Sequence, residues 1–104
     1  IDDLLIPKKE TFSTHVYHQY TLKVKGGKRD ELKTFLEQND IPAMIYYPVP
    51  LHKQKAFLPI ARQGGTLNVS ETLAEQVLSL PMHTELDEEQ QTYIISKVRE
   101  FFSK

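Results

Sequence analysis

Residues 46–54 read Tyr-Tyr-Pro-Val-Pro-Leu-His-Lys-Gln, and this stretch is the most informative part of the chain. Two tyrosines end a predicted strand, and a Pro-x-Pro sequence follows at once. Proline fixes φ and lacks an N–H donor, so this backbone cannot continue as a helix or as a central strand. A rigid segment with aromatic and hydrogen-bonding side chains at the end of a strand is typical of a binding loop.

The chain upstream of this loop predicts two strands with a helix between them. Residues 15–25 alternate between apolar and polar side chains, which is the period of a half-buried strand. Residues 29–38 carry apolar side chains at i, i+3 and i+4, which predicts a short amphipathic helix. Residues 41–47 are rich in β-forming side chains and predict the second strand, with a proline tolerated near its start.

The chain downstream of the loop predicts a helix followed by a short extended segment. Asn68 and Glu71 have the spacing of a capping box, so we expect a helix to begin there. Its apolar face is expected to bury Leu73 and Val77, with Ala74 as a further candidate. The Ser-Leu-Pro sequence at 79–81 predicts a short extended segment.

The last predicted helix completes an α+β pattern. Asp87 and Gln90 have the spacing of a second capping box. Five apolar residues are then expected on one helical face: Ile94, Ile95, Val98, Phe101 and Phe102. The whole order predicts a two-layer α+β sandwich, with a small sheet of about three strands packed with helices. We expect residues 15–104 to form this domain and residues 1–14 to be a linker or the remnant of a preceding domain.

Composition limits the class of protein. A chain of 104 residues is expected to form one domain. Lys and Arg number 13 against 14 Asp and Glu, which argues against a nucleic-acid partner because such partners call for a basic excess. No apolar run approaches ~18 residues, so no membrane span is expected. The absence of cysteine excludes disulfides and fits a reducing cytoplasm.

Tyr46 and Tyr47 are the first candidate site residues. Successive strand residues face opposite ways, so we expect one tyrosine to pack inside and the other to project. The alternative is that both are ordinary half-buried strand residues.

His52, Lys53 and Gln54 share the loop after the prolines. His52 is either a solvent-exposed loop residue or a hydrogen-bond donor to a ligand. Lys53 could attract phosphate as a point charge, although a solvated lysine is the default interpretation.

Two other clusters are expected to be structural. His15 and His18 are three residues apart on a predicted strand and point to opposite faces, so we expect no metal site there and place His18 in the core. The turn after this strand carries a basic cluster, expected to be a solvated edge: Lys23, Lys25, Lys28 and Arg29.

Four segments together resemble a known family. They are residues 15–20, 29–32, 46–54 and 77–83, the last reading Val-Leu-Ser-Leu-Pro-Met-His. In this order they resemble the C-terminal small domain of the DegT/DnrJ/StrS-type sugar aminotransferases, which have fold type I. The sequence departs from the family locally at Asn39-Asp40, where glycine is common. The large domain that carries the Schiff-base lysine is missing from the sequence.

The resemblance implies a function for the complete enzyme. Such enzymes transfer an amino group from an amino acid, typically glutamate, to a nucleotide-linked keto-sugar, using pyridoxal phosphate (PLP). The missing large domain would bind PLP, so the chain is expected to hold no catalytic or cofactor-binding residue and to be inactive alone. Tyr46, Tyr47, His52 and Gln54 would bind the nucleotide-sugar substrate. The resemblance also implies a homodimer, and we expect it in the cytoplasm.

One alternative function remains open from the sequence. The predicted strand and helix order also suits a stand-alone ferredoxin-like module that binds a small ligand or RNA. The near-neutral charge and the absence of an aromatic pair in the usual glycine-aromatic context argue against RNA.

Overall fold

The computed structural model describes residues 1–103, which form three short strands, three α-helices and one 3-10 helix. In chain order they are strand β1 (Leu4–Leu5), strand β2 (Tyr20–Val24), helix α1 (Arg29–Glu37), the 3-10 helix η1 (Leu51–Lys53), helix α2 (Asn68–Gln76), strand β3 (Val77–Leu80) and helix α3 (Glu88–Phe102). Within the described residues this is an α+β fold with a three-stranded sheet, as the sequence predicted.

The sheet is antiparallel and has the order β1-β2-β3. Leu22 of β2 lies opposite Leu78 of β3, and Leu4 of β1 lies opposite Val24. The period of a strand places Leu22 and Val24 on the same face, and both are buried. On the opposite face the hydroxyls of Thr21 and Ser79 lie 2.9 Å apart in a hydrogen bond.

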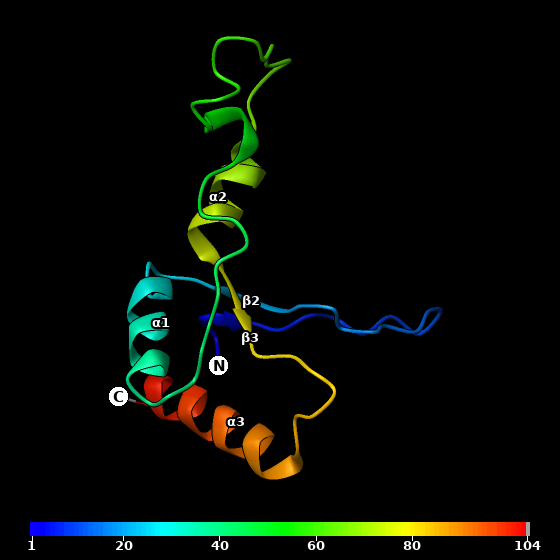
Figure 1. Ribbon diagram of the computed structural model, residues 1–104, viewed down its shortest axis with the longest axis vertical. Helices are drawn as coiled ribbons and strands as arrows, with labels where there is room; N and C mark the ends of the chain where they lie inside the picture. Colours follow the sequence, from blue (N-terminus) through cyan, green and yellow to red (C-terminus); the bar gives the residue numbers. More distant parts are fainter. Residues whose placement is uncertain (104) are drawn as a thin grey trace.

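Helices α1 and α3 pack against each other and against one face of the sheet (Figure 1). The core that they enclose combines the apolar stripes of both helices, the inward side chains of β2 and β3, and two residues from the segment after α1. Its members are Leu22, Val24, Leu32, Leu36, Ile41, Ala43, Leu78, Ile94 and Val98. The helix predicted over 29–38 is therefore confirmed, and its apolar stripe faces the sheet.

The capping predictions have different outcomes. At α3 the capping box is confirmed, because Gln90 N donates to Asp87 Oδ1 at 2.7 Å and the Gln90 side chain accepts from Asp87 N. At α2 it is wrong, because Asn68 is already helical and the N-cap residue, Leu67, makes no side-chain cap hydrogen bond.

Three predictions of burial are also wrong. Leu73 on α2 is exposed, whereas its neighbour Ala74 is buried. Val77 lies in β3 rather than on the helix and is half-buried. Ile95 is 50% exposed because it follows buried Ile94 by one residue and so points about 100° away around α3.

The strand predicted over 41–47 does not form. Met44 alone makes a bridge, with Met44 N donating to Ser79 O at 3.0 Å and Ser79 N donating to Met44 O at 2.7 Å. The prolines explain this limit, because Pro42 has no N–H to offer and Pro48 ends any pairing beyond the tyrosines. The segment instead crosses the edge of β3 once, with Ile41 and Ala43 buried.

The first predicted strand is shorter than expected. Pairing with β1 and β3 covers only Tyr20–Val24, so within the described residues 15–19 are not part of the sheet. Val16 is 89% exposed, and His18 is exposed rather than in the core. Leu4–Leu5 supplies the third strand from the segment predicted to be a linker, because Leu4 packs against the core. A domain boundary at residue 15 stays a prediction.

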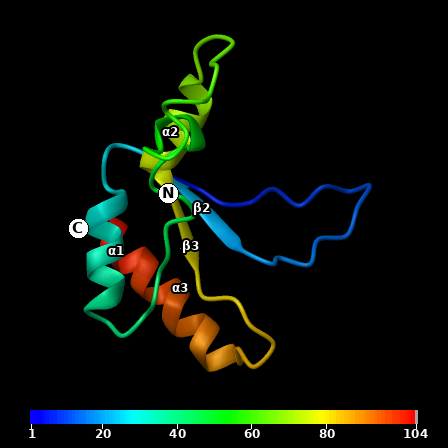
Figure 2. The same ribbon diagram turned by 45° about the horizontal axis from the view of Figure 1, so that its top comes forward.

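Helix α2 and the loop before it project from the body formed by the sheet, α1 and α3 (Figures 1 and 2). The extents of the molecule, 48 × 35 × 26 Å, reflect this projection. Helix α2 runs directly into β3, so its orientation is set at that junction.

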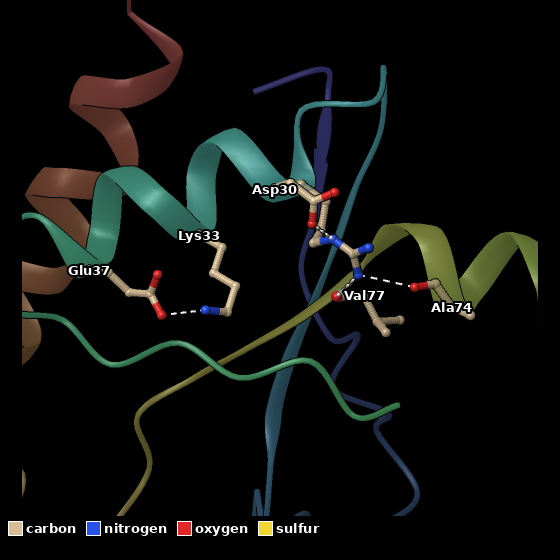
Figure 3. A network of polar contacts seen from close by, with 6 residues as sticks. Asp30, Lys33, Glu37, Ala74 and Val77 are labelled. Atoms are coloured by element: carbon tan, nitrogen blue, oxygen red, sulfur yellow. Dashed lines mark hydrogen bonds and ion pairs between the residues drawn. The ribbon is translucent and has the colours of Figure 1, made fainter. Parts of the chain in front are cut away.

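The side chain of Arg29 secures the junction between α2 and β3. Its guanidinium donates to the carbonyl of Ala74 at 3.0 Å and, more weakly, to that of Val77 at 3.3 Å (Figure 3). Arg29 Nε also donates to Asp30 at 2.6 Å. The last carbonyls of a helix lack intrahelical partners and carry partial negative charge, so a cation stabilises them.

The prediction of a solvated basic cluster is therefore wrong for Arg29, whose side chain is only 11% exposed. Lys28 is also paired, with Asp3 at 2.8 Å. The carbonyl partners of Arg29 are 45 and 48 residues away, and Asp3 is 25 residues from Lys28, so the local pattern could not indicate these contacts.

Replacing Arg29 tests this junction. Arg29→Met keeps an unbranched apolar stem and removes the donors, so we expect the free energy of unfolding to fall by about 1.5–3 kcal/mol. The matched control is Arg99→Met on the exposed surface of α3, expected to change it by less than about 0.5 kcal/mol. Urea titrations measure both, and equal effects of the two variants would contradict the role given to Arg29.

Candidate functional site

A cleft of about 500 Å³ lies between the proline loop and helix α2. One wall is formed by loop residues that include Tyr46, Tyr47 and His52. The other wall is the face of α2 that carries Ser70 and Leu73. The structure thus brings together three of the four residues that the sequence predicted for the site.

Both tyrosines are available to a ligand in this cleft. Tyr46 is 38% exposed and Tyr47 is 70% exposed, with their rings in an edge-to-face arrangement at 5.8 Å between centroids. The prediction that one of them packs inside is wrong, because residues 45–47 are not in a strand and strand alternation does not apply. Tyr46 also lines a second cleft of about 340 Å³, together with His18 and His83.

His52 is a half-buried residue rather than a free loop side chain. It lies on the 3-10 turn η1, which begins immediately after Pro50. Its side chain is 13% exposed, and its Nε2 lies 3.0 Å from Oε1 of Glu71. The same ring lines the large cleft and a neighbouring cleft of about 210 Å³, where Arg62 also lies.

Glu71 holds two consecutive loop residues at once. One carboxylate oxygen contacts His52, and the other lies 2.7 Å from Nζ of Lys53. The hydrogen bond from Lys53, followed by that from His52, lowers the pKa of the Glu71 carboxyl below its usual value of 4.5. Lys53 remains half in solvent but is ion-paired, which its sequence context did not indicate.

Sequence reasoning gave Glu71 a different role. Its spacing from Asn68 suggested a capping box, but its carboxylate faces the loop instead. A carboxylate in the first turn of a helix is favoured by the helix dipole, and that position was the only available signal. Its partners, 18 and 19 residues away, could not be read from a local pattern.

Gln54 occupies a different place from the other three predicted residues. Its side-chain amide donates to the carbonyl of Val49 at 3.4 Å, a long bond that closes the loop on itself. It is not among the residues that line the large cleft, and a role in binding stays a prediction.

The cleft offers binding groups rather than a cofactor site. The described residues that line it include no lysine, so it supplies no amine for a Schiff base, and the fit to PLP is poor. Within residues 1–103, no group of three His, Asp or Glu side chains is close enough to hold a metal ion. Helix α3, the longest in that part of the chain, falls short of a bilayer span, and no other described helix reaches one.

The contact of Glu71 predicts a pH-dependent stability. Because folding lowers the pKa of this carboxyl, its ionised form contributes stability above pH 4.5, and that contribution is lost as the pH falls through the lowered pKa. We therefore expect Glu71→Gln to be less stable than wild type at about pH 7, and the gap to narrow by about pH 3, below the usual pKa of 4.5. Urea titrations at both values measure the gap.

Glu75→Gln is the matched control for this prediction. Glu75 is an exposed carboxylate on the same helix. Its replacement should change the free energy of unfolding by less than about 0.5 kcal/mol. A gap for Glu71→Gln that stays constant down to about pH 3 would show that the carboxylate charge does not stabilise the fold.

Comparison with known proteins places the chain in a family. Residues 2–99 match the model of the DegT/DnrJ/EryC1/StrS aminotransferase family. The chain is 45% identical over 103 residues to the pleiotropic regulatory protein of Geobacillus stearothermophilus, covering 98% of this chain and 27% of that protein. It is also 45% identical over 98 residues to UDP-N-acetyl-3-dehydro-alpha-D-glucosamine 3-aminotransferase of Acidithiobacillus ferrooxidans, covering 93% of this chain and 25% of that protein.

A solved structure gives the same result. The crystal structure of S. venezuelae DesV in complex with a ketimine intermediate superposes with a TM-score of 0.88 and 32% identity, covering 98% of this chain and 27% of that one. The chain thus spans about a quarter of the length of its relatives. With a family model that covers nearly its whole length, the chain belongs to the DegT/DnrJ/EryC1/StrS aminotransferase family.

Proposed function

We propose that the chain is the C-terminal small domain of an enzyme that transfers an amino group from an amino acid to a nucleotide-linked keto-sugar. Glutamate is the proposed amino donor. Residues 15–104 would form this domain, with Leu4–Leu5 completing its sheet. The rest of the enzyme would supply the lysine and the pocket for PLP, the cofactor that the family resemblance implies. The chain alone would be inactive, because the family resemblance assigns that lysine to the rest of the enzyme.

The observation that carries this proposal is the meeting of Tyr46, Tyr47 and His52 in one cleft. Aromatic faces pack well against a sugar ring or a base, and phenol and imidazole groups can hydrogen-bond to hydroxyls or a diphosphate. The cleft volume, about 500 Å³, is typical of small-molecule sites. The relative from Acidithiobacillus ferrooxidans carries the name of an enzyme for a UDP-linked sugar, which supports the substrate class.

The role of this domain would be substrate binding rather than chemistry. The cleft would form one wall of the site, and Gln54 would act from the far side of the same loop. We propose a homodimer, as the family resemblance implies, and a cytoplasmic location, which a cysteine-free sequence permits. An RNA-binding module is less well supported, because Tyr46 and Tyr47 lie outside the three strands of the described sheet, whereas sheet-based RNA binders stack bases on strand aromatics.

Single substitutions in the complete enzyme test the binding role. We expect Tyr46→Phe, Tyr47→Phe or His52→Ala to lower kcat/KM for the keto-sugar nucleotide, because each removes a hydrogen bond to a polar ligand. At least one variant should lose about 5- to 150-fold. The half-reaction with the amino donor should keep its rate, since that chemistry belongs to the other domain. Stopped-flow spectra of the cofactor measure each half-reaction separately.

Tyr93→Phe is the matched control. Tyr93 lies on α3, and its hydroxyl donates to the carbonyl of Asn39 at 3.2 Å. This variant therefore also loses a tyrosine hydrogen bond, but one outside the cleft. It should leave both half-reactions unchanged. If the three site variants keep normal sugar kinetics while stability falls, the loop is structural and the binding role is wrong.

A further inference from the structure

The contact between His52 and Glu71 joins two separate segments of the chain at the cleft. His52 comes from the turn after the prolines, and Glu71 comes from the first turn of α2. Their side chains meet at 3.0 Å, and both are largely shielded, with 13% and 34% exposure. A shielded, short contact of this kind restricts the rotation of an imidazole that would otherwise be free to turn.

The chemistry of the two groups fixes which ring nitrogen carries a hydrogen. An ionised carboxylate can only accept hydrogen bonds, so Nε2 of His52 must be the donor to Glu71. While the ring is neutral, Nδ1 then carries a lone pair and can only accept. Within residues 1–103, Nδ1 of His52 has no hydrogen-bond partner, so it is the ring nitrogen left for a ligand.

Glu71 is ionised at neutral pH even at its usual pKa of 4.5, and Lys53 favours that form further. Its ammonium group lies 2.7 Å from the second carboxylate oxygen and lowers the pKa of Glu71 more than any other neighbour does. The position of Glu71 in the first turn of α2 favours the same charge. The carboxylate is therefore ionised at neutral pH, with one oxygen in contact with His52 and the other in contact with Lys53.

We propose that Glu71 is a positioning residue, which holds His52 as the Nε2–H tautomer and leaves Nδ1 to accept a hydrogen bond from a sugar hydroxyl in the cleft. This inference rests on the proposed function, because it takes the ligand to be a sugar nucleotide. It makes the role of His52 in that function specific, because the partner of its ring is then a hydroxyl of the sugar. Glu71 itself would not touch the substrate.

The first arm of the test measures the ring directly in the 104-residue chain. The protein is labelled with ¹⁵N-histidine, and long-range ¹H–¹⁵N NMR spectra are taken at a pH where the imidazole rings are neutral. These spectra report which ring nitrogen carries the proton and whether that proton is protected from exchange with water. We expect wild type to show a protected Nε2–H for His52. Glu71→Ala should lose that protection, whereas Glu71→Gln should keep part of it because an amide oxygen can still accept.

Lys53→Met is the matched control for the first arm. It breaks the other half of the Glu71 contact and should retain the protected Nε2–H signal. If Glu71→Ala keeps that signal, or Lys53→Met abolishes it to the same degree, the positioning role is overturned.

The second arm is a double-mutant cycle in the complete enzyme, with the sugar half-reaction as its readout. A residue that acts through His52 has no effect once His52 is gone. We therefore expect Glu71→Ala to lower kcat/KM for the sugar nucleotide, and to change it by less than about twofold in the His52→Ala background. The amino-donor half-reaction and Glu75→Gln serve as controls that should stay at the wild-type rate.

The two arms separate the failure of this inference from the failure of the proposed function. Additive losses in the cycle would overturn the positioning role while leaving His52 as a binding residue. If His52→Ala alone leaves sugar kinetics unchanged, the hydroxyl contact given to Nδ1 is overturned while the two tyrosines keep their binding role. If Tyr46→Phe, Tyr47→Phe and His52→Ala all leave sugar kinetics unchanged, the proposed function fails. In that case the NMR arm alone decides whether Glu71 holds the ring, with loss of the protected proton in Glu71→Ala supporting it and retention overturning it.

Discussion

The position of the cleft depends on the hydrogen bonds that the guanidinium of Arg29 makes. It starts on α1, which is packed into the core, and it reaches the carbonyls of Ala74 and Val77 at the junction of α2 and β3. Helix α2 has a single buried residue and projects beyond the sheet, so core packing alone gives it little support. A charged donor to two helix-end carbonyls supplies the missing restraint at the one point where the helix direction is set.

The loop that faces α2 is held at two points, and both belong to the same α2–β3 unit. Met44 pairs with Ser79 on β3, after the helix, and the His52–Lys53 pair contacts Glu71 at the start of the helix. Residues 45–51 therefore span the length of α2 between two fixed ends. This geometry explains how two exposed tyrosines and a half-buried histidine can line one cleft without being part of the core.

The sequence predicted the local features of this architecture well and its long-range contacts poorly. Helical spacing located α1 and α3, and the capping box at Asp87 was read correctly, because these features involve residues within one turn of each other. The strand predicted at 41–47 failed because β-propensity says nothing about whether a partner strand is within reach. Arg29 was assigned to solvent because its partners, Ala74 and Val77, are 45 and 48 residues away.

The candidate site shows the same division. The proline loop and the family resemblance grouped Tyr46, Tyr47, His52 and Gln54, and the structure places all but Gln54 on one cleft. Glu71 was missed as their companion because its spacing from Asn68 fitted a local role. The family resemblance carried the substrate class, which no arrangement of strands and helices could have supplied.

A crystal structure of the complete enzyme with its keto-sugar nucleotide, or with the aminated product, tests the central claim most directly. The account predicts that the ligand contacts at least one ring of Tyr46 and Tyr47, and that a ligand hydroxyl lies within about 3.2 Å of Nδ1 of His52. A ligand that lies away from all three residues, for example in the cleft between His18 and His83, would contradict it.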